Sequence, residues 1–194
     1  MSREAHWNTA SEQLVKSIGE KSLSLQWLHN KSDDLFNYYN NFLAIPSIII
    51  STVAGAGSIG FGDEGRDASL ILGSLSIAVS IISTLNSYFA FAKRAENHRV
   101  TAISYSKLYL QISIEMSLPR DKRTVVKEFI KSISEQIQRL NEVQPNIPYR
   151  VIEEYKVVFK DEPNTIAKPP CVNGLEEIKV LHEDDKNLII QPIG

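Results

Sequence analysis

The apolar and charged positions of this chain are sharply separated along the sequence. Residues 42–61 and 68–92 contain no Asp, Glu, Lys or Arg, whereas the sequence on either side carries nearly all of the charges. As helices, stretches of 20 and 25 residues extend about 30 Å and about 38 Å, and the hydrocarbon core of a bilayer is about 30 Å thick. The pattern therefore predicts two transmembrane helices, the second long enough to tilt.

The two apolar stretches are joined by residues 62–67, GDEGRD, which hold four charges. A loop this short makes its helices antiparallel neighbours, and its charges require water. The alternative is a pair of buried helices in a soluble domain, but the rest of the chain is too small and too polar to cover them. The sequence favours an integral membrane protein with a helical hairpin, residues 42–92, because uncharged runs of this length are typical of membrane spans.

Basic residues near the membrane ends predict the orientation of the hairpin. The loop holds Arg66 alone, whereas the opposite ends of the spans are flanked by Lys31, Lys93, Arg94, Arg99 and Lys107. Cytoplasmic segments carry the excess of Lys and Arg, so both termini are expected in the cytoplasm. Aromatic residues typical of a membrane interface gather at the same end: Tyr38, Tyr39, Phe42, Tyr88, Phe89 and Phe91. The N-terminus shows no secretory signal.

Amphipathic helices are predicted on both sides of the hairpin. Residues 1–41 should form an N-terminal cytoplasmic helix, because apolar residues recur near multiples of 3.6. They are Leu14, Ile18, Leu25, Leu28, Leu35 and Tyr39. Residues 93–160 should begin with a straight continuation of the second span that ends before Pro119. Its apolar stripe is Ala95, Ala102, Tyr105, Tyr109, Ile112 and Met116.

A further helix in this region is predicted to start near Asp121 and to end before Pro145. Residues 149–160 are predicted to form one to three more turns of amphipathic helix. The first has the steps of four and three of a coiled-coil seam. The seam is Val126, Ile130, Ile133, Ile137 and Leu140.

In the tail, residues 161–194, three prolines precede two β-rich runs on either side of an acidic turn. We therefore predict an all-α fold, a transmembrane hairpin extended by long cytoplasmic helices, with a short tail that is irregular or a β-hairpin for a protein partner.

Small residues form one seam on each apolar helix, in steps of four and three. The first seam is Ser47, Ser51, Ala54 and Ser58, and the second is Ser69, Gly73, Ser76, Ser80, Ser83 and Ser87. Small side chains let helix backbones approach closely in lipid. The seams either pack the two helices together, which is the usual role of such residues, or line a hydrated path between several copies of the hairpin.

Candidate chemistry is scarce in this sequence. No ionisable residue lies inside the spans, so a pump or secondary transporter is not expected. Pro46 is interpreted as part of the first turn of its helix, and Asn86 as a hydrogen-bonding group between helices. Cys171 is the only cysteine, and the four histidines are scattered. We expect no enzyme, catalytic residue, cofactor, metal or small-molecule substrate, and the net charge of -2 does not favour nucleic acid.

Several short motifs, taken in order, resemble the SLATT family of two-span membrane proteins, which includes members from large DNA viruses. They are Trp27 with Leu28, Asn41 with IPSIIISTVAGAG, AENHR at residues 95–99, Tyr105 with Leu108, and PNIP at residues 145–148. The similarity covers about residues 7–160. It implies a self-associating hairpin and, from bacterial relatives, a pore-forming effector triggered by a nucleotide-sensing partner.

The resemblance assigns no catalytic residue. The family's motif positions correspond to Pro46 and Ser47 at the first span, and to Glu96, His98 and Arg99 where the second span is expected to leave the membrane. These last three residues are either a polar cluster facing the entering helix or a solvated, interface-anchoring face.

Two hypotheses follow from the sequence. The first is a self-associating, homo-oligomeric two-span protein that forms a pore. The second is a structural membrane anchor or scaffold, such as a virion inner-membrane protein that links the bilayer to a capsid shell. The chain has no room for a fused nucleotide sensor, and the tail at residues 161–194 lies outside the resemblance, which suggests a dedicated partner.

Overall fold

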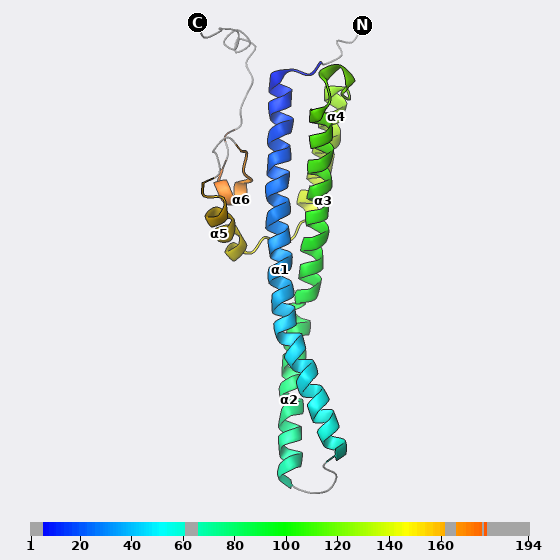
Figure 1. Ribbon diagram of the computed structural model, residues 1–194, viewed down its shortest axis with the longest axis vertical. Coiled ribbons are helices and arrows are strands. Elements are labelled where there is room, and N and C mark those ends of the chain that lie inside the picture. Colours follow the sequence, from blue (N-terminus) through cyan, green and yellow to red (C-terminus); the bar gives the residue numbers. More distant parts are fainter. Residues whose placement is uncertain (1–5, 61–65, 162–165, 176, 178–194) are drawn as a thin grey trace. The chain divides into compact units, whose positions relative to one another are not determined.

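The computed structural model describes residues 6–60, 66–161, 166–175 and 177, and within these ranges it contains helices and no strands (Figure 1). The elements, in order, are α1 (Thr9–Gly60), α2 (Arg66–Phe89), α3 (Phe91–Ser117), the 3-10 turn η1 (Arg120–Lys122), α4 (Val126–Val143), α5 (Tyr149–Val158) and α6 (Pro170–Asn173). The all-α class is thus confirmed for the described part of the chain. The β-hairpin predicted in the tail lies outside the described residues.

The chain divides into two compact units. The bundle unit comprises Met1–Gln26, Ile103–Val143 and Ile152–Gly194, and the hairpin unit comprises Trp27–Ala102 and Gln144–Val151. Helices α1 and α3 each contribute residues to both units, so each unit is described below by its own contacts.

Helix α1 runs without a break from the predicted cytoplasmic segment into the first apolar stretch. Pro46 therefore lies inside α1, and its interpretation as part of a helix start was wrong. A proline inside a helix has no N–H to bond the carbonyl four residues earlier, here that of Phe42. The long apolar sequence still favours a helix, because one missing hydrogen bond removes only one rung of a ladder of 52 residues.

A single residue separates α2 from α3. Ala90 has φ +49°, the left-handed region that side chains with a Cβ rarely adopt. The helical ladder continues across it, because the Ala90 amide donates to the Asn86 carbonyl at 2.9 Å and the Arg94 amide donates to the Ala90 carbonyl at 3.0 Å. The helix therefore continues past the second apolar stretch, as predicted, with one local distortion at Ala90.

The core of the bundle unit lies between α1, α3 and α4. Its buried members are Trp7, Val15, Tyr105, Leu108, Ile112, Val126, Phe129 and Ile133. The seam predicted on residues 126–140 and much of the stripe predicted on α3 pack into this core. Leu14 was wrongly placed in it, because its side chain is 49% exposed while the neighbouring Val15 is fully buried.

Charged side chains bind the N-terminal end of α1 to the segment that connects α3 to α4. Glu12 accepts hydrogen bonds from Arg120 Nε at 2.8 Å and from Arg123, whose guanidinium also lies over the Trp7 ring. The Trp7 indole N–H donates to the Thr124 carbonyl at 2.8 Å. These contacts hold together segments that are more than 100 residues apart in sequence.

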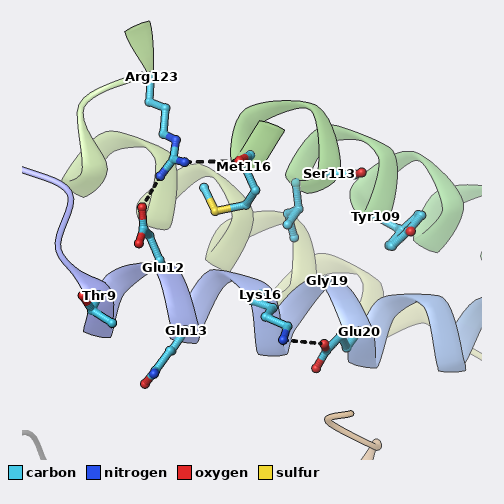
Figure 2. Close-up of a pocket in the computed structure, with 11 residues that line it drawn as sticks. Thr9, Glu12, Gln13, Lys16, Gly19, Glu20, Tyr109, Ser113, Met116 and Arg123 are labelled. Carbon is cyan, nitrogen blue, oxygen red and sulfur yellow. Dashed lines mark hydrogen bonds and ion pairs between the residues drawn. The ribbon is translucent and has the colours of Figure 1, made fainter. Parts of the chain in front are cut away.

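An open groove of about 420 Å³ lies beside these charges, between α1 and α3 of the bundle unit. Figure 2 shows the residues that line it. Gly19 lies at its floor, and a Cβ added there would come within 3.0 Å of Ile112 Cγ2. The two backbones therefore approach closely at this point. The groove is rimmed by the Lys16–Glu20 ion pair and by the Glu12–Arg123 pair.

The segment after α4 folds back onto α1 in the bundle unit. The hydroxyls of Ser24 and Tyr155 are 2.8 Å apart and buried, and the Ala167 amide donates to Glu20 Oε2 at 2.8 Å. Both contacts use polar side chains of α1. Residues after Pro148 are thereby held to the first helix.

Acid should weaken the bundle unit through Glu12. The hydrogen bonds from Arg120 and Arg123 lower the pKa of Glu12 from 4.5 to about 2. A carboxyl whose pKa is lower in the folded state stabilises the fold above pH 4.5, and this contribution is lost as the pH falls toward 2. We expect Glu12→Gln to lower the unfolding midpoint at pH 7 and to flatten its decline between pH 4.5 and 2. Thermal unfolding measured across this range tests it, and an unchanged decline in the variant would contradict the assignment.

Candidate membrane hairpin and buried histidine pair

Two helical segments are long and apolar enough to cross a membrane: Thr9–Gly57 and Ser69–Ser117. Their most apolar 18-residue stretches are 11% and 0% buried inside the structure. Core helices of soluble proteins have the same composition but are mostly covered by the rest of the fold. The described residues of this chain leave these stretches uncovered, and exposed isoleucines such as Ile48 and Ile77 are each 64% accessible.

The apolar parts of α1 and α2 lie side by side within the hairpin unit (Figure 1). Ser47 Oγ and Ser83 Oγ are 3.3 Å apart, and Ser47 and Ala54 are the buried positions of α1 at this contact. On α2 the partly buried positions recur in steps of three and four: Leu72, Leu75, Val79, Ile82 and Asn86. Small residues on α1 thus face mainly larger apolar residues on α2.

The second seam lies at the edge of this contact. Ser83 bonds Ser47, and Gly73 and Ser76 line a hollow together with α1. Its members are nonetheless all exposed: Ser69, Gly73, Ser76, Ser80, Ser83 and Ser87. The first seam is divided, because Ser47 and Ala54 are buried whereas Ser51 is exposed, and the side chain of Ser58 lies outside the described residues. The structure therefore brings only part of the predicted small residues together, and it leaves one face of α2 lined by small side chains.

Hydroxyl groups on this face are bonded within their own helix. Ser76 donates to the Leu72 carbonyl at 3.0 Å, Ser80 to the Ser76 carbonyl at 2.9 Å and Thr84 to the Ser80 carbonyl at 2.8 Å. Such bonds satisfy the hydroxyl hydrogen without a partner helix and lower the cost of placing serine in lipid. A hollow of about 410 Å³ lies along the face. A second, of about 400 Å³, lies between α2 and residues Ser51, Ala54 and Gly55 of α1.

Asn86 was predicted to bond across the helix contact. Its Oδ1 is buried and has no hydrogen-bond partner among the described residues. The side chain therefore leaves an acceptor unused in an apolar environment, which is costly. It lies one turn before Ala90, so the two irregular features of α2 are adjacent.

Aromatic rings gather where α1 and α3 leave the apolar stretches. The Phe36 and Phe91 rings are 6.3 Å apart, those of Tyr39 and Phe91 5.5 Å, and those of Tyr38 and Phe42 6.3 Å. Tyr38 and Phe42 remain more than 60% exposed. This arrangement agrees with the aromatic positions expected at one membrane interface.

The three polar residues predicted at the membrane exit separate into two groups. Glu96 and Arg99 form an exposed ion pair at 2.7 Å, and the hydrogen bond from Arg99 lowers the pKa of Glu96. Asp33 on α1 lies near this pair, and burial together with Asp34 raises its pKa. His98 points the other way and is buried at 1% exposure.

His98 meets His29 of α1 inside the hairpin unit. Their Nδ1 atoms are 2.8 Å apart, and His29 is fully buried. His29 Nε2 lies 3.4 Å from Gln144 Oε1, in the segment that connects α4 to α5. Two buried hydroxyls, Ser32 and Thr101, lie on the same helix faces, so this part of the α1–α3 contact is polar.

The histidine pair is neutral at physiological pH. Burial lowers the pKa of His29, and burial together with the nearby charge of a protonated His29 lowers that of His98 to about 4. An Nδ1–Nδ1 hydrogen bond requires one ring to donate and the other to accept. Two imidazoles are too few for a metal site of the usual kind, and no group of three metal-ligating side chains occurs among the described residues.

Sequence reasoning singled out His98 but missed His29. The one available signal was position, because His29 and Ser32 follow the apolar residues Leu25 and Leu28 on a predicted core face. No family model, curated protein or solved structure matches this chain.

Proposed function

We propose that this protein is a two-span membrane protein that self-associates through the small-residue face of α2. The supporting observation is the exposure of that face, together with the lack of cover over the two apolar helices. Lipid would cover the large apolar side chains, while a second copy would fit against the Ser and Gly positions, where backbones can approach closely. An added Cβ at Gly73 would meet nothing within 4 Å, so the face is open for such contact.

The resemblance to the SLATT family extends this proposal to a pore. Several copies arranged around their α2 faces would surround a path lined by serine oxygens, which remain acceptors after their hydrogens bond the helix. In this arrangement both termini lie in the cytoplasm, and residues 161–194 bind a protein partner. The proposal includes no enzymatic activity, cofactor, nucleic acid or small-molecule substrate.

Bulky residues on the α2 face test self-association and conduction together. Ser80→Leu combined with Ser87→Leu fills the face without touching the Ser47–Ser83 contact. Overpacking costs roughly 1–3 kcal/mol, so we expect association to weaken at least about fivefold. Light scattering in detergent and conductance in planar bilayers provide the measurements.

The control is Ala78→Leu, which adds one leucine at an exposed position that is not part of the seam. It should leave association and conductance unchanged. Equal association of the double variant and the parent protein would reject the α2 face as the interface. Conductance that survives in a protein unable to associate would reject the pore of several copies.

A second candidate function is a membrane anchor or scaffold. It is favoured by one observation, that the hydroxyls of the α2 face are already bonded to their own helix and need no water. An anchor would associate in the bilayer but remain silent in conductance, and it would bind a shell protein through residues 161–194. A tail-deleted protein that associates but no longer binds that shell protein would support this function over the pore.

A further inference from the structure

The polar contact between α1 and α3 joins three segments of the hairpin unit. His29 comes from α1, His98 from α3 and Gln144 from the connector, defined as residues 144–151, which join α4 to α5 and include the first turn of α5. The Phe36 ring stacks on His98 with centroids 5.4 Å apart and closes one side. Ser32, fully buried, uses its hydroxyl on the Leu28 carbonyl at 2.8 Å. The imidazoles therefore lie in a site with little access to water.

Charged groups on the neighbouring turns make contacts of their own, with an amide, with aromatic rings or with each other. On α1, Asp33 accepts a hydrogen bond from Asn37 and Lys31 lies over the Trp27 ring. On α3, Arg99 pairs with Glu96 and Arg94 lies over the Phe36 ring. The connector presents the neutral Gln144, and its charged Arg150 is exposed.

The contact with Gln144 indicates which ring nitrogen of each histidine carries a hydrogen. With Gln144 Oε1 as an acceptor, His29 Nε2 carries a hydrogen, so His29 Nδ1 accepts the hydrogen of His98 Nδ1. A proton added to His98 Nε2 places a charge beside the Phe36 ring in a buried site. A proton added to His29 Nδ1 sets two N–H groups against each other, which removes the hydrogen bond between the rings.

We propose that the histidine pair is an acid-operated latch that holds the connector to α1 and α3 and releases it when the rings are protonated. Opening lets both imidazoles reach water, where the charged form costs little. Release frees the connector and separates α1 from α3 next to the apolar helices. The latch concerns helices outside the apolar stretches, so it does not depend on whether the hairpins associate or conduct.

Hydrogen exchange of the connector amides in the full-length protein in detergent tests the latch. The rates are compared at pH 7.5 and pH 5 after correction for the intrinsic effect of pH on exchange. A single imidazole whose pKa falls from 6.5 to about 4 on burial raises the fraction open by about 30-fold between these conditions. We expect an increase of this order in the parent protein, confined to the connector and the facing turns of α1 and α3.

Two variants keep the test independent of folding. His29→Leu combined with His98→Phe fills the site with groups that do not titrate and should abolish the pH effect. His6→Gln changes an exposed histidine and should retain it. Equal corrected rates at both pH values in the parent protein, or a pH effect that persists in the double variant, would overturn the proposal. Should the double variant misfold, nitrogen NMR of the parent's histidine rings still decides, because rings already charged at pH 6.5 contradict a neutral buried pair.

Discussion

The variant Ile81→Asp should fail to insert its second apolar helix into a bilayer. Ile81 lies near the middle of residues 68–92 and is 57% exposed, so within the chain it has ample space for a carboxylate. On the surface of a soluble protein this change alters stability by less than about 0.5 kcal/mol. At the centre of a membrane span an aspartate costs roughly 2.5–3.5 kcal/mol, which lowers the equilibrium constant for insertion roughly a hundredfold. Translation in the presence of microsomes, followed by carbonate extraction, measures the inserted fraction.

The matched control for this experiment is Ile114→Asp. Ile114 is 55% exposed and belongs to α3 of the bundle unit, beyond the predicted spans, so its carboxylate should leave insertion unchanged. A parent protein that stays monodisperse in buffer without detergent, with Ile81→Asp behaving in the same way, would show that protein and not lipid covers these helices.

Local sequence signals predicted the helices well, because each signal acts over a few residues. Pro119 follows the end of α3, and Pro145 follows the end of α4 at Val143. The start of α4 was displaced from near Asp121 to Val126, because η1 intervenes and the Thr124 amide bonds the Glu115 side chain. Such a bond between a backbone amide and a side chain of the preceding helix leaves no periodic trace in the sequence.

The pairing of helix faces was predicted less well. The serine period on α2 suggested a contact with α1, yet the partly buried positions there are Leu75, Val79 and Ile82, each one residue before a serine of the seam. Ser83 bonds Ser47 at the edge of this contact. Two adjacent stripes on one helix share the same spacing, so period alone does not select between them. Their chemistry does not decide either, since both small and aliphatic residues pack in membranes.

The histidine pair shows a further limit of a single sequence. His29 and His98 are 69 residues apart, and each alone looks like an isolated polar residue on a helix. Their pairing depends on the antiparallel register of α1 and α3, which is fixed by other contacts such as Phe36 with Phe91. Only the assembled helices turn the two side chains into one titrating group.

Truncation of the bundle core should destabilise one unit and spare the other. Ile133 is fully buried among α1, α3 and α4, so we expect Ile133→Ala to cost about 2–5 kcal/mol, from lost burial and the cavity left behind. Trp7 reports on this core because its ring lies 5.9 Å from that of Phe129, and a Trp27→Phe background makes it the sole indole. Denaturant unfolding in detergent, followed by Trp7 fluorescence, measures the loss of stability. The neutral control is Val143→Ala, a change at a 74% exposed position of the same helix. Self-association should persist in Ile133→Ala, because the α2 face belongs to the hairpin unit. Loss of self-association in this variant would show that the two units unfold together.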